Sequence, residues 1–277
     1  MEFQKSVIEL IKIRKSSRTY DEIKIKKSTE DKLINYMETL NNTTKIGARF
    51  VVTNDNSKEE EQKLGTYGVI KGAKTFIVGI MDKKEENAVE FGYLFEKIIL
   101  FATDLGLQTC WMGGTFNKSQ FRKTLNLAEN EFIPIVSPIG IRKEKPRVFE
   151  STMRLAAGAN KRKDWSELFF EESASNSLNK EHLGDYAVPL EMVRIGPSAS
   201  NKQPWRIIKN GNQFQFFLCK TIGYGVMEYD IQRNDMGIAK CHFELSAIEK
   251  GLNGRWIVEN PTNTFNEWEY IFTWLAE

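Results

Sequence analysis

The feature that most constrains this chain is an internal repeat. When the sequence is shifted by 145 residues, segment 91–111 aligns with segment 236–256. The identical pairs are Gly92 and Gly237, Leu100 and Leu245, Ala102 and Ala247, Gly106 and Gly251, Leu107 and Leu252, and Trp111 and Trp256. Amphipathic helices share apolar spacing by chance, but a matched helix-ending glycine, leucine and tryptophan indicate a duplication. A duplicated unit predicts a covalently fused pseudo-dimer with an approximate two-fold axis, and chance similarity is the alternative.

Length and composition narrow the class of protein. The 277 residues suit one large domain or two ordinary ones, and we expect a first half at 1–170 and a degenerate second half at 171–277. The net charge of +2 gives no general attraction to nucleic acid, and no apolar run reaches the roughly 20 residues that span a bilayer. The start of the chain lacks a secretory signal pattern, so we expect a cytoplasmic protein without membrane association. Three cysteines and two histidines predict neither a disulfide framework nor a metal site.

Hydrophobic periodicity predicts alternating helices and strands, which makes the expected fold class α+β. The expected helices are 3–13, 28–40, 85–105, 180–193 and 235–250, the second beginning at Ser28 with Asp31 completing a capping box. The expected strands are 49–53, 75–81, 133–141, 205–209 and 213–219. Two prolines in 133–141 indicate an edge strand or an irregular path, and Asn210-Gly211 predicts a hairpin. The Ser/Asn-rich stretch 171–180 is the best candidate for a linker.

A basic segment follows the first predicted helix. It holds two guanidinium groups, an ammonium and hydroxyls within five residues, at Arg14, Lys15, Ser16, Ser17 and Arg18. This combination suits a phosphate, because arginine binds phosphate through a planar fork of donors. A solvated basic turn is the alternative interpretation.

Two further segments combine rigidity with small residues. In segment 197–205 (PSASNKQPW), prolines fix the backbone, small residues let a flat ligand approach, and Asn201 and Gln203 offer donors and acceptors. In segment 106–114 (GLQTCWMGG), a helix ends and Gly113 and Gly114 permit close contact of the backbone with a ligand. The alternative for each segment is a structural turn.

Together these segments resemble the nitroreductase family of flavoproteins. Arg14, Ser16 and Arg18 are similar to the family's phosphate motif, PSASNKQPW to its flavin-edge motif, and segment 105–114 to its glycine loop. The basic segment Lys161-Arg162-Lys163 is similar to the one that reaches the phosphate. The resemblance implies a nitroreductase-like fold and FMN as the cofactor. The cofactor-binding residues that it implies are Arg14, Lys15, Ser16, Arg18, Trp111, Met112, Gly113, Gly114, Lys161, Arg162, Lys163, Pro197, Ser198, Ala199, Ser200, Asn201 and Gln203, with no catalytic side chain and no metal ligand.

The order of the motifs departs from the family pattern. The flavin-edge motif would ordinarily lie between the basic segment and the glycine loop, where this chain reads NNTTKIGAR at 41–49. The sequence predicts that the first helix recurs at 165–176, which places Glu172 opposite Arg14, and the counterpart of the glycine loop at 256–261 has lost both glycines. Each half thus retains what the other lacks. The pattern predicts one composite FMN site per chain and a monomer.

The resemblance implies an enzyme that transfers electrons from NAD(P)H to a small acceptor, such as a nitroaromatic or a quinone, by a ping-pong mechanism. Three alternatives stay open. They are a non-catalytic FMN-binding protein for storage or sensing, a flavin-consuming or dehalogenating enzyme on the same fold, and a structural pseudo-dimer without cofactor. Tyr224, Met227 and Tyr229 are either residues that line the acceptor pocket or core residues. The sequence specifies neither the acceptor nor the choice between NADH and NADPH.

Overall fold

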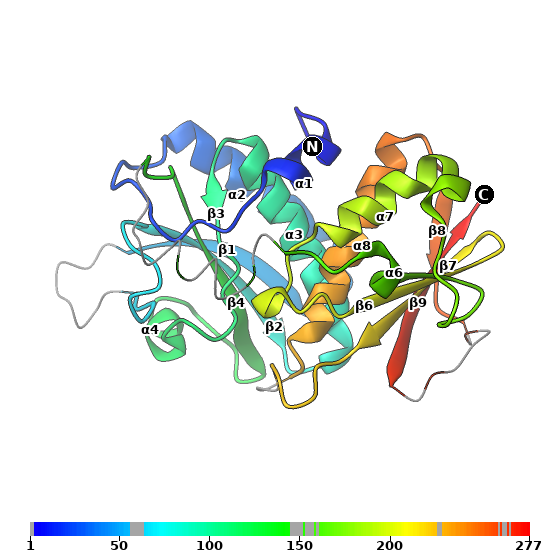
Figure 1. Ribbon diagram of the computed structural model, residues 1–277. Coiled ribbons are helices and arrows are strands. Elements are labelled where there is room, and N and C mark those ends of the chain that lie inside the picture. The colour runs from blue at the N-terminus through cyan, green and yellow to red at the C-terminus, as the bar shows by residue number, and fades with distance from the viewer. Residues whose placement is uncertain are drawn as a thin grey trace. The chain divides into compact units, whose positions relative to one another are not determined.

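The computed structural model describes residues 3–55, 64–144, 152, 158, 161–225, 229–259, 261, 265 and 267–277. The chain forms two compact units, and most of their helices and strands are labelled in Figure 1. Unit 1 comprises Met1–Lys5, Ile13–Asn87 and Leu94–Ala156, and unit 2 comprises Ser6–Lys12, Ala88–Tyr93 and Ala157–Glu277. These bounds differ from the expected halves because most of the first helix packs in unit 2. The expected halves 1–170 and 171–277 are the two copies of the predicted duplication, and this division stays a prediction.

Unit 1 is built on a four-stranded antiparallel sheet of order β1-β2-β4-β3. The strands are β1 (Ala48–Asn54), β2 (Thr75–Asp82), β4 (Glu131–Gly140) and β3 (Gln108–Thr109). The helices are α2 (Lys27–Thr43), most of α3 (Ala88–Asp104) and α4 (Lys118–Lys123), with the short helix η2 (Glu85–Asn87) before α3. The strands expected at 49–53 and 75–81 are therefore confirmed.

Both faces of the central strand β2 are covered by apolar residues. Every residue of β2 except the last, Asp82, is buried. Phe76, Val78 and Ile80 face a core that includes Phe121 of α4. On β1, Phe50 contacts Phe95 of α3 at 6.0 Å between ring centroids, and Tyr36 of α2 stacks on Phe101 of α3 at 4.1 Å. A strand buried on both sides explains the continuous apolar run 76–81.

The strand β4 takes the irregular path that its prolines predict, but it is not an edge strand. It lies between β2 and β3, and its register with β2 shifts between Gly79 and Met81, opposite Pro134. A proline has no N–H to donate to the neighbouring strand, so the ladder is interrupted there. The second helix also differs from expectation. It begins at Lys27 after Lys26, without a side-chain cap, so the capping box predicted at Ser28 is wrong.

Unit 2 contains a five-stranded sheet of order β5-β6-β7-β9-β8. The strands are β5 (Phe169–Glu171), β6 (Trp205–Asn210), β7 (Gln213–Cys219), β9 (Trp268–Ala276) and β8 (Gly254–Ile257), and only the pair β5–β6 is parallel among the described strands. The predicted hairpin is confirmed. Asn210 pairs with Gln213, and Gly211 adopts the positive φ of 57° that favours glycine in a tight turn.

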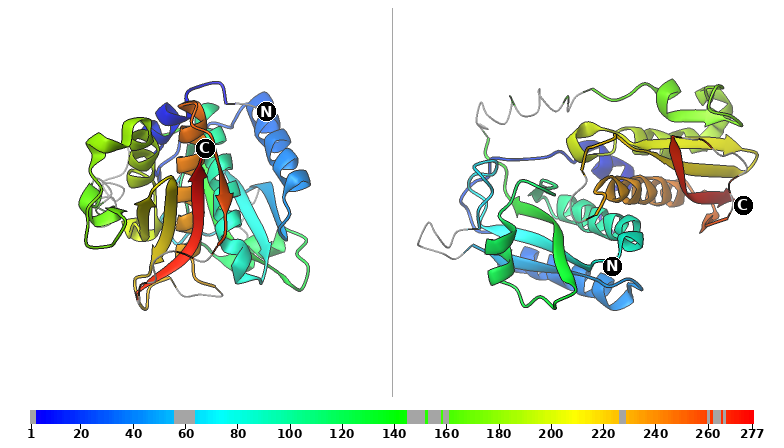
Figure 2. Two further views of the ribbon diagram at one scale, coloured as in Figure 1. Left: turned by 90° about the vertical axis from the view of Figure 1, so that its right-hand side faces the viewer. Right: turned by 90° about the horizontal axis from the view of Figure 1, so that it is seen from below.

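The helices of unit 2 are the greater part of α1 (Val7–Ile13), α6 (Trp165–Leu168), η3 (Lys180–Tyr186), α7 (Ala187–Arg194), η4 (Ala199–Asn201) and α8 (Gln232–Glu249). Apolar residues of α7 and α8 share one core with β6, β7 and β9, so both helices lie on the same face of the sheet (Figure 2). The start of α1 is held in this unit, because Ser6 and the backbone N–H of Val7 donate to the carboxylate of Glu249.

Two sequence expectations fail in unit 2. The stretch 171–180 is not a linker between units, because Leu178 is buried and its N–H donates to Phe169 O at 3.1 Å. The recurrence of the first helix at 165–176 holds for one turn only. Residues 165–168 are helical and then enter strand β5, whereas α1 stays helical to Ile13.

The ends of α3 and α8 are alike in detail. Leu107 N donates to Ala102 O at 2.9 Å, and Leu252 N donates to Ala247 O at the same distance. The glycines before these leucines, Gly106 and Gly251, have φ of 79° and 70°. A backbone that folds back through a left-handed glycine satisfies the last carbonyls of a helix. The sequence repeat thus corresponds to a repeated helix end.

Candidate functional site

In unit 1 the basic segment runs beside the start of the glycine loop. Ser16 forms an isolated parallel bridge with Thr109, and Ser17 N donates to Thr109 O at 2.9 Å. The hydroxyl of Ser17 also donates to the side chain of Gln108 at 3.1 Å. Two predicted segments that lie about ninety residues apart in the sequence are therefore neighbours in this unit.

A buried carboxylate joins the same two segments. Glu96 of α3 is fully buried, accepts a hydrogen bond from Trp111 Nε1 at 2.8 Å, and lies 4.0 Å from Arg14 Nε. Burying an ionised carboxylate is costly unless it is paired and hydrogen-bonded, and Glu96 has both kinds of partner. The position of Arg14 is therefore coupled to that of Trp111 at the head of the glycine loop. No sequence pattern marks Glu96, which lies among the apolar residues of an ordinary helix.

The glycine loop leaves this point along β4. Met112 is buried and exchanges two backbone hydrogen bonds with Val136, each 3.0 Å long. Gly113 is half-buried and Gly114 is exposed. The loop thus presents backbone without side chains immediately after a firmly anchored residue, as close contact with a ligand requires.

In unit 2 the segment 197–205 is a strained loop. Ser200, Asn201 and Gln203 have positive φ angles of 46°, 56° and 49°. Each left-handed non-glycine residue costs about 1–3 kcal/mol and persists only where the surroundings enforce it, most often at functional sites. Here the surroundings include Ser198, whose hydroxyl accepts from Gln203 N at 2.8 Å.

The amide side chains of this loop bind the basic segment 161–163. Asn201 Nδ2 donates to the carbonyl oxygens of Gly158 and Lys161 at 2.8 and 2.7 Å. Gln203 Oε1 accepts from Lys163 N at 2.8 Å. These two amides therefore hold the loop in place, whereas the sequence suggested only contacts with the edge of a ring.

Arg162, the middle residue of the basic segment, also makes hydrogen bonds that hold this loop. The guanidinium of Arg162 donates to Asn201 Oδ1 and, through Nη2 at 3.1 Å, to Ile195 O. Lys161 is exposed and Lys163 is partly buried. The structure thus brings segments 161–163 and 197–203 together within unit 2, with Arg162 bound to the loop that follows Ile195.

A buried carboxyl group, that of Asp235, holds the loop 197–205 through a backbone hydrogen bond. It lies in the first turn of α8, is buried, and accepts a hydrogen bond from Ala199 N at 3.0 Å. Burial raises the pKa of Asp235 well above its ordinary value, the Ala199 N–H acts in the opposite direction, and the nearby Asp230 raises it further. No sequence pattern marks Asp235, because an aspartate near the start of a helix is ordinary.

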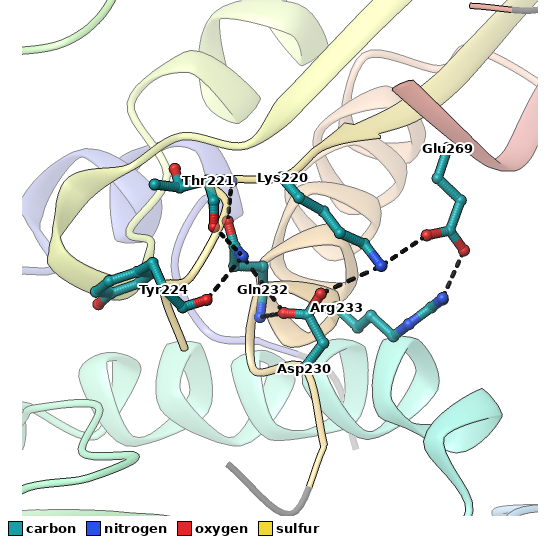
Figure 3. Close-up of polar contacts among 7 residues, drawn as sticks. All are labelled: Lys220, Thr221, Tyr224, Asp230, Gln232, Arg233 and Glu269. Atoms are coloured by element: carbon teal, nitrogen blue, oxygen red, sulfur yellow. Dashed lines mark hydrogen bonds and ion pairs between the residues drawn. The ribbon is translucent and has the colours of Figure 1, made fainter. Parts of the chain in front are cut away.

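The segment after β7 is clamped beside the loop by Gln232 (Figure 3). The side chain of Gln232 accepts from Thr221 N at 2.8 Å and donates to Tyr224 O at 3.0 Å, and the backbone N–H of Gln232 donates to Asp230 Oδ1 at 3.0 Å. Lys220 bridges Asp230 and Glu269, at 3.3 and 2.9 Å. This network fixes the backbone of Tyr224, whose hydroxyl donates to Ser200 Oγ at 2.7 Å. Tyr229 is buried, and Met227 lies outside the described residues.

The structure groups the predicted residues into two constellations, one in each unit. Unit 1 holds Arg14, Lys15, Ser16, Arg18, Trp111, Met112, Gly113 and Gly114, and unit 2 holds Lys161, Arg162, Lys163, Pro197, Ser198, Ala199, Ser200, Asn201 and Gln203. Within the described ranges no cluster of three His, Cys, Asp or Glu suits a metal ion. No helix in the described part of the chain combines the length and the apolarity needed to cross a bilayer.

The chain is thus an α+β protein with two sheets. It carries basic segments at 14–18 and 161–163 and a strained loop with two amide side chains at 197–205. The family described as "Putative TM nitroreductase" matches residues 6–247, and the chain belongs to this family. Its fold is accordingly nitroreductase-like. A crystal structure of a putative nitroreductase from Thermotoga maritima is similar over 99% of this chain and 95% of that chain, with 20% identity and a TM-score of 0.61.

Other solved structures match about half of the chain. An FMN-dependent nitroreductase from Clostridium difficile is 22% identical over 50% of this chain and 90% of its own, with a TM-score of 0.39. A putative NADH dehydrogenase/NAD(P)H nitroreductase from Bacteroides thetaiotaomicron is 23% identical over 52% and 91%, with a TM-score of 0.41. No curated protein matches the sequence.

Proposed function

We propose that this chain binds one FMN and transfers electrons from NAD(P)H to nitroaromatic, quinone or similar electron-poor acceptors by a ping-pong mechanism. Membership of the nitroreductase family over residues 6–247 supports an oxidoreductase. The observation that carries the proposal furthest is the Ser16–Thr109 bridge, because it makes a phosphate-type donor segment and a glycine loop neighbours in unit 1.

The donors present in the two constellations fit FMN. A phosphate dianion takes several charge-assisted hydrogen bonds, and Arg14, Lys15, Ser16 and Arg18 supply guanidinium, ammonium and hydroxyl groups for them. A flat ring needs backbone and small side chains around it, as Gly113, Gly114 and the 197–200 segment offer. When bound, FMN would supply the redox chemistry, and the protein would supply orientation and electrostatics.

In this proposal the side chains divide into ligand-binding and loop-holding groups. Arg14, Arg18 and Ser16 bind the phosphate, and the backbone N–H groups of Gly113 and Gly114 face the ring, where developing negative charge is stabilised by fixed donors. Asn201, Gln203 and Arg162 keep the flavin-edge loop in its strained form through the bonds described above. We assign no acid–base side chain.

We propose one composite site per chain for two reasons. The chain contains a duplicated unit, and the second copy has lost residues that would bind a second flavin. The shared helix ends of α3 and α8 support the duplication. Segment 256–261 keeps neither glycine of the loop 105–114, and an acidic Glu172 follows β5 in the second half. A second phosphate beside Glu172 would meet repulsion without compensating arginines. A pseudo-dimer, a monomeric state and a cytoplasmic location remain predictions of the proposal.

Flavin content tests the cofactor assignment. Protein purified without added cofactor should contain about one FMN per chain by visible spectrum and by quantitation of the released flavin. An Arg14→Glu/Arg18→Glu variant should lose FMN but keep its weaker affinity for riboflavin, which lacks the phosphate. Lys12→Glu, an exposed change on α1, is the matched control and should retain FMN. Two FMN per chain would overturn the composite site, and no FMN even after soaking would overturn the assignment.

Turnover separates an enzyme from a binding protein. The FMN-loaded chain should oxidise NAD(P)H steadily only when a nitroaromatic or a quinone is present, with parallel double-reciprocal lines. One FMN per chain without such turnover would instead identify the non-catalytic alternative. Consumption of the flavin itself during aerobic reduction would identify the flavin-consuming alternative.

A further inference from the structure

The short segment 220–225, which follows β7 and is called the arm below, is closely packed. Tyr224 N donates to Thr221 O at 3.2 Å, so the arm turns back on itself. Gly225 adopts a positive φ of 74°, and a side chain there would collide with the side chain that precedes α8. The backbone of the arm is therefore well defined, although Ile222 at its tip is 98% exposed.

The side chain of Gln232, a buried residue of α8, binds both ends of the arm (Figure 3). It accepts from Thr221 N at 2.8 Å, and it donates to Thr221 O at 3.3 Å and to Tyr224 O at 3.0 Å. Lys220 adds an ion pair with Glu269 of β9 at 2.9 Å. The position of the Tyr224 backbone is therefore set from α8 and β9.

The side chain of Tyr224 joins the arm to the strained loop of the same unit. Its hydroxyl donates to Ser200 Oγ at 2.7 Å. The ammonium of Lys202 lies over its ring, 5.2 Å from the centroid. Tyr224 is half-buried and its hydroxyl is engaged, which disfavours the interpretation of Tyr224 as a core residue. The tyrosine thus contacts the loop on both sides of Asn201.

The left-handed residues of this loop have separate anchors. The amide side chains of Asn201 and Gln203 bind the basic segment 161–163. Ser200 has a φ of 46°, and among the described residues its side chain bonds to Tyr224 alone. A serine in this conformation is unfavourable and persists where its contacts enforce it. Loss of the Tyr224 hydroxyl would therefore remove the side-chain contact that holds Ser200.

We propose that Tyr224 is a positioning residue for the ring of the flavin and that it acts through Ser200. This role rests on the proposed function, because Ser200 belongs to the segment 197–200 that would border the ring. Tyr224 itself needs no contact with the ligand. Gln232 holds the arm, the arm holds Tyr224, and the hydroxyl of Tyr224 holds Ser200 in its left-handed form.

Titration of the full chain, freed of flavin, with riboflavin and with FMN tests the proposal. Tyr224→Phe removes only the hydroxyl and should weaken both ligands about threefold to tenfold, by the same factor, because the phosphate contacts are untouched. Tyr186→Phe removes a hydroxyl that bonds to Asn253 O at 3.3 Å in the same unit. This matched control should change either affinity less than twofold. Unchanged flavin affinity with a raised KM for the acceptor would overturn the positioning role and place Tyr224 in the acceptor pocket.

A double-variant cycle separates positioning from a general loosening of unit 2. Ser200→Ala deletes the acceptor of the same hydrogen bond. Tyr224→Phe/Ser200→Ala should therefore bind riboflavin no more weakly than the weaker-binding single variant. If the two losses multiply instead, the hydroxyl does not act through Ser200 and the proposal fails.

Amide hydrogen exchange without flavin separates this role from the proposed function. Asn201 N donates to Ser198 O at 2.9 Å, and Gln203 N donates to Ser198 Oγ at 2.8 Å. Exchange of both amides should accelerate in Tyr224→Phe and not in Tyr186→Phe. A parent chain that binds no flavin would refute the proposed function, and accelerated exchange would then still assign Tyr224 to the loop. A parent chain that binds flavin, with exchange in the loop unchanged by Tyr224→Phe, would refute only the positioning role.

Discussion

Gly92 of α3 and Gly237 of α8 pack reciprocally where the two helices meet in unit 2. A side chain at Gly92 would collide with the backbone of Asn234, and one at Gly237 would collide with the backbone of Val89 and Tyr93. The 145-residue shift places Val89 on Asn234, so the two contacts are symmetry mates. Two copies related by a two-fold axis make each contact twice, with the roles of the copies exchanged. The geometry supports the proposed duplication where the sequence alone left chance as an alternative.

We therefore expect Gly92→Ala and Gly237→Ala to destabilise the protein similarly. Alanine favours a helix by about 1 kcal/mol over glycine, but overpacking a close contact costs typically 1–3 kcal/mol, and backbone atoms cannot rotate away. Denaturant unfolding should show a net loss of about 1–2 kcal/mol for each variant. Ile248→Ala, an exposed change on α8, should stay within about 0.5 kcal/mol of the parent. A stabilised glycine variant would show that the helices are free to separate.

The carboxyl group of Asp235 should make stability decrease as pH rises. Its pKa in the folded protein is raised by burial, so the folded state binds more protons than the unfolded state between about pH 4, the ordinary value, and the raised value. The associated stability is present below pH 4 and is lost as pH rises through the folded pKa. Asp235→Asn still accepts from Ala199 N and should flatten this part of the profile.

Removing the side chain of Gln232 should release the segment that carries Tyr224. Gln232→Ala leaves Thr221 N and two carbonyl groups without their partner, and an unsatisfied buried group costs about 1–3 kcal/mol. Amide hydrogen exchange at Thr221 should accelerate, while exchange in the hairpin Asn210–Gln213 should not. Ile222→Ala, on the exposed tip of the same segment, is the control. Unchanged protection of Thr221 would contradict the clamp.

Trp111→Phe tests the carboxylate that links the basic segment to the glycine loop. The variant keeps an aromatic ring beside Phe95 but removes the hydrogen bond to the buried Glu96. We expect a loss of about 1–3 kcal/mol, because the carboxylate remains buried with one partner fewer. The double variant Trp111→Phe/Glu96→Gln should lose less than the sum of the two single variants, because both changes remove the same hydrogen bond, although Glu96→Gln also removes the counter-charge of Arg14. Additive losses would show that the two residues act independently.

Patterns that depend on neighbours along the chain could be predicted from the sequence. Gly106 and Gly251 end their helices and Asn210-Gly211 turns a hairpin, because backbone dihedral preferences act locally. The short β-branched run 75–81 predicted a strand for the same reason. Where a local signal competed with packing, the prediction failed, as for the Ser28 capping box and the segment 171–180, in which the apolar Leu178 is buried in unit 2.

The candidate site likewise has features that the sequence determined and features that depend on the tertiary structure. The sequence by itself determined which residue types are available, namely the arginines at 14 and 18, the paired glycines at 113 and 114, and the loop 197–205. Only the tertiary structure decided how they are used: Arg162, Asn201 and Gln203 bind one another's segments, and Glu96 couples Arg14 to Trp111. These pairings are made across tens of residues, and they depend on strand order and burial. A side chain's identity sets which bonds it is able to make, whereas the fold sets which partner lies within reach.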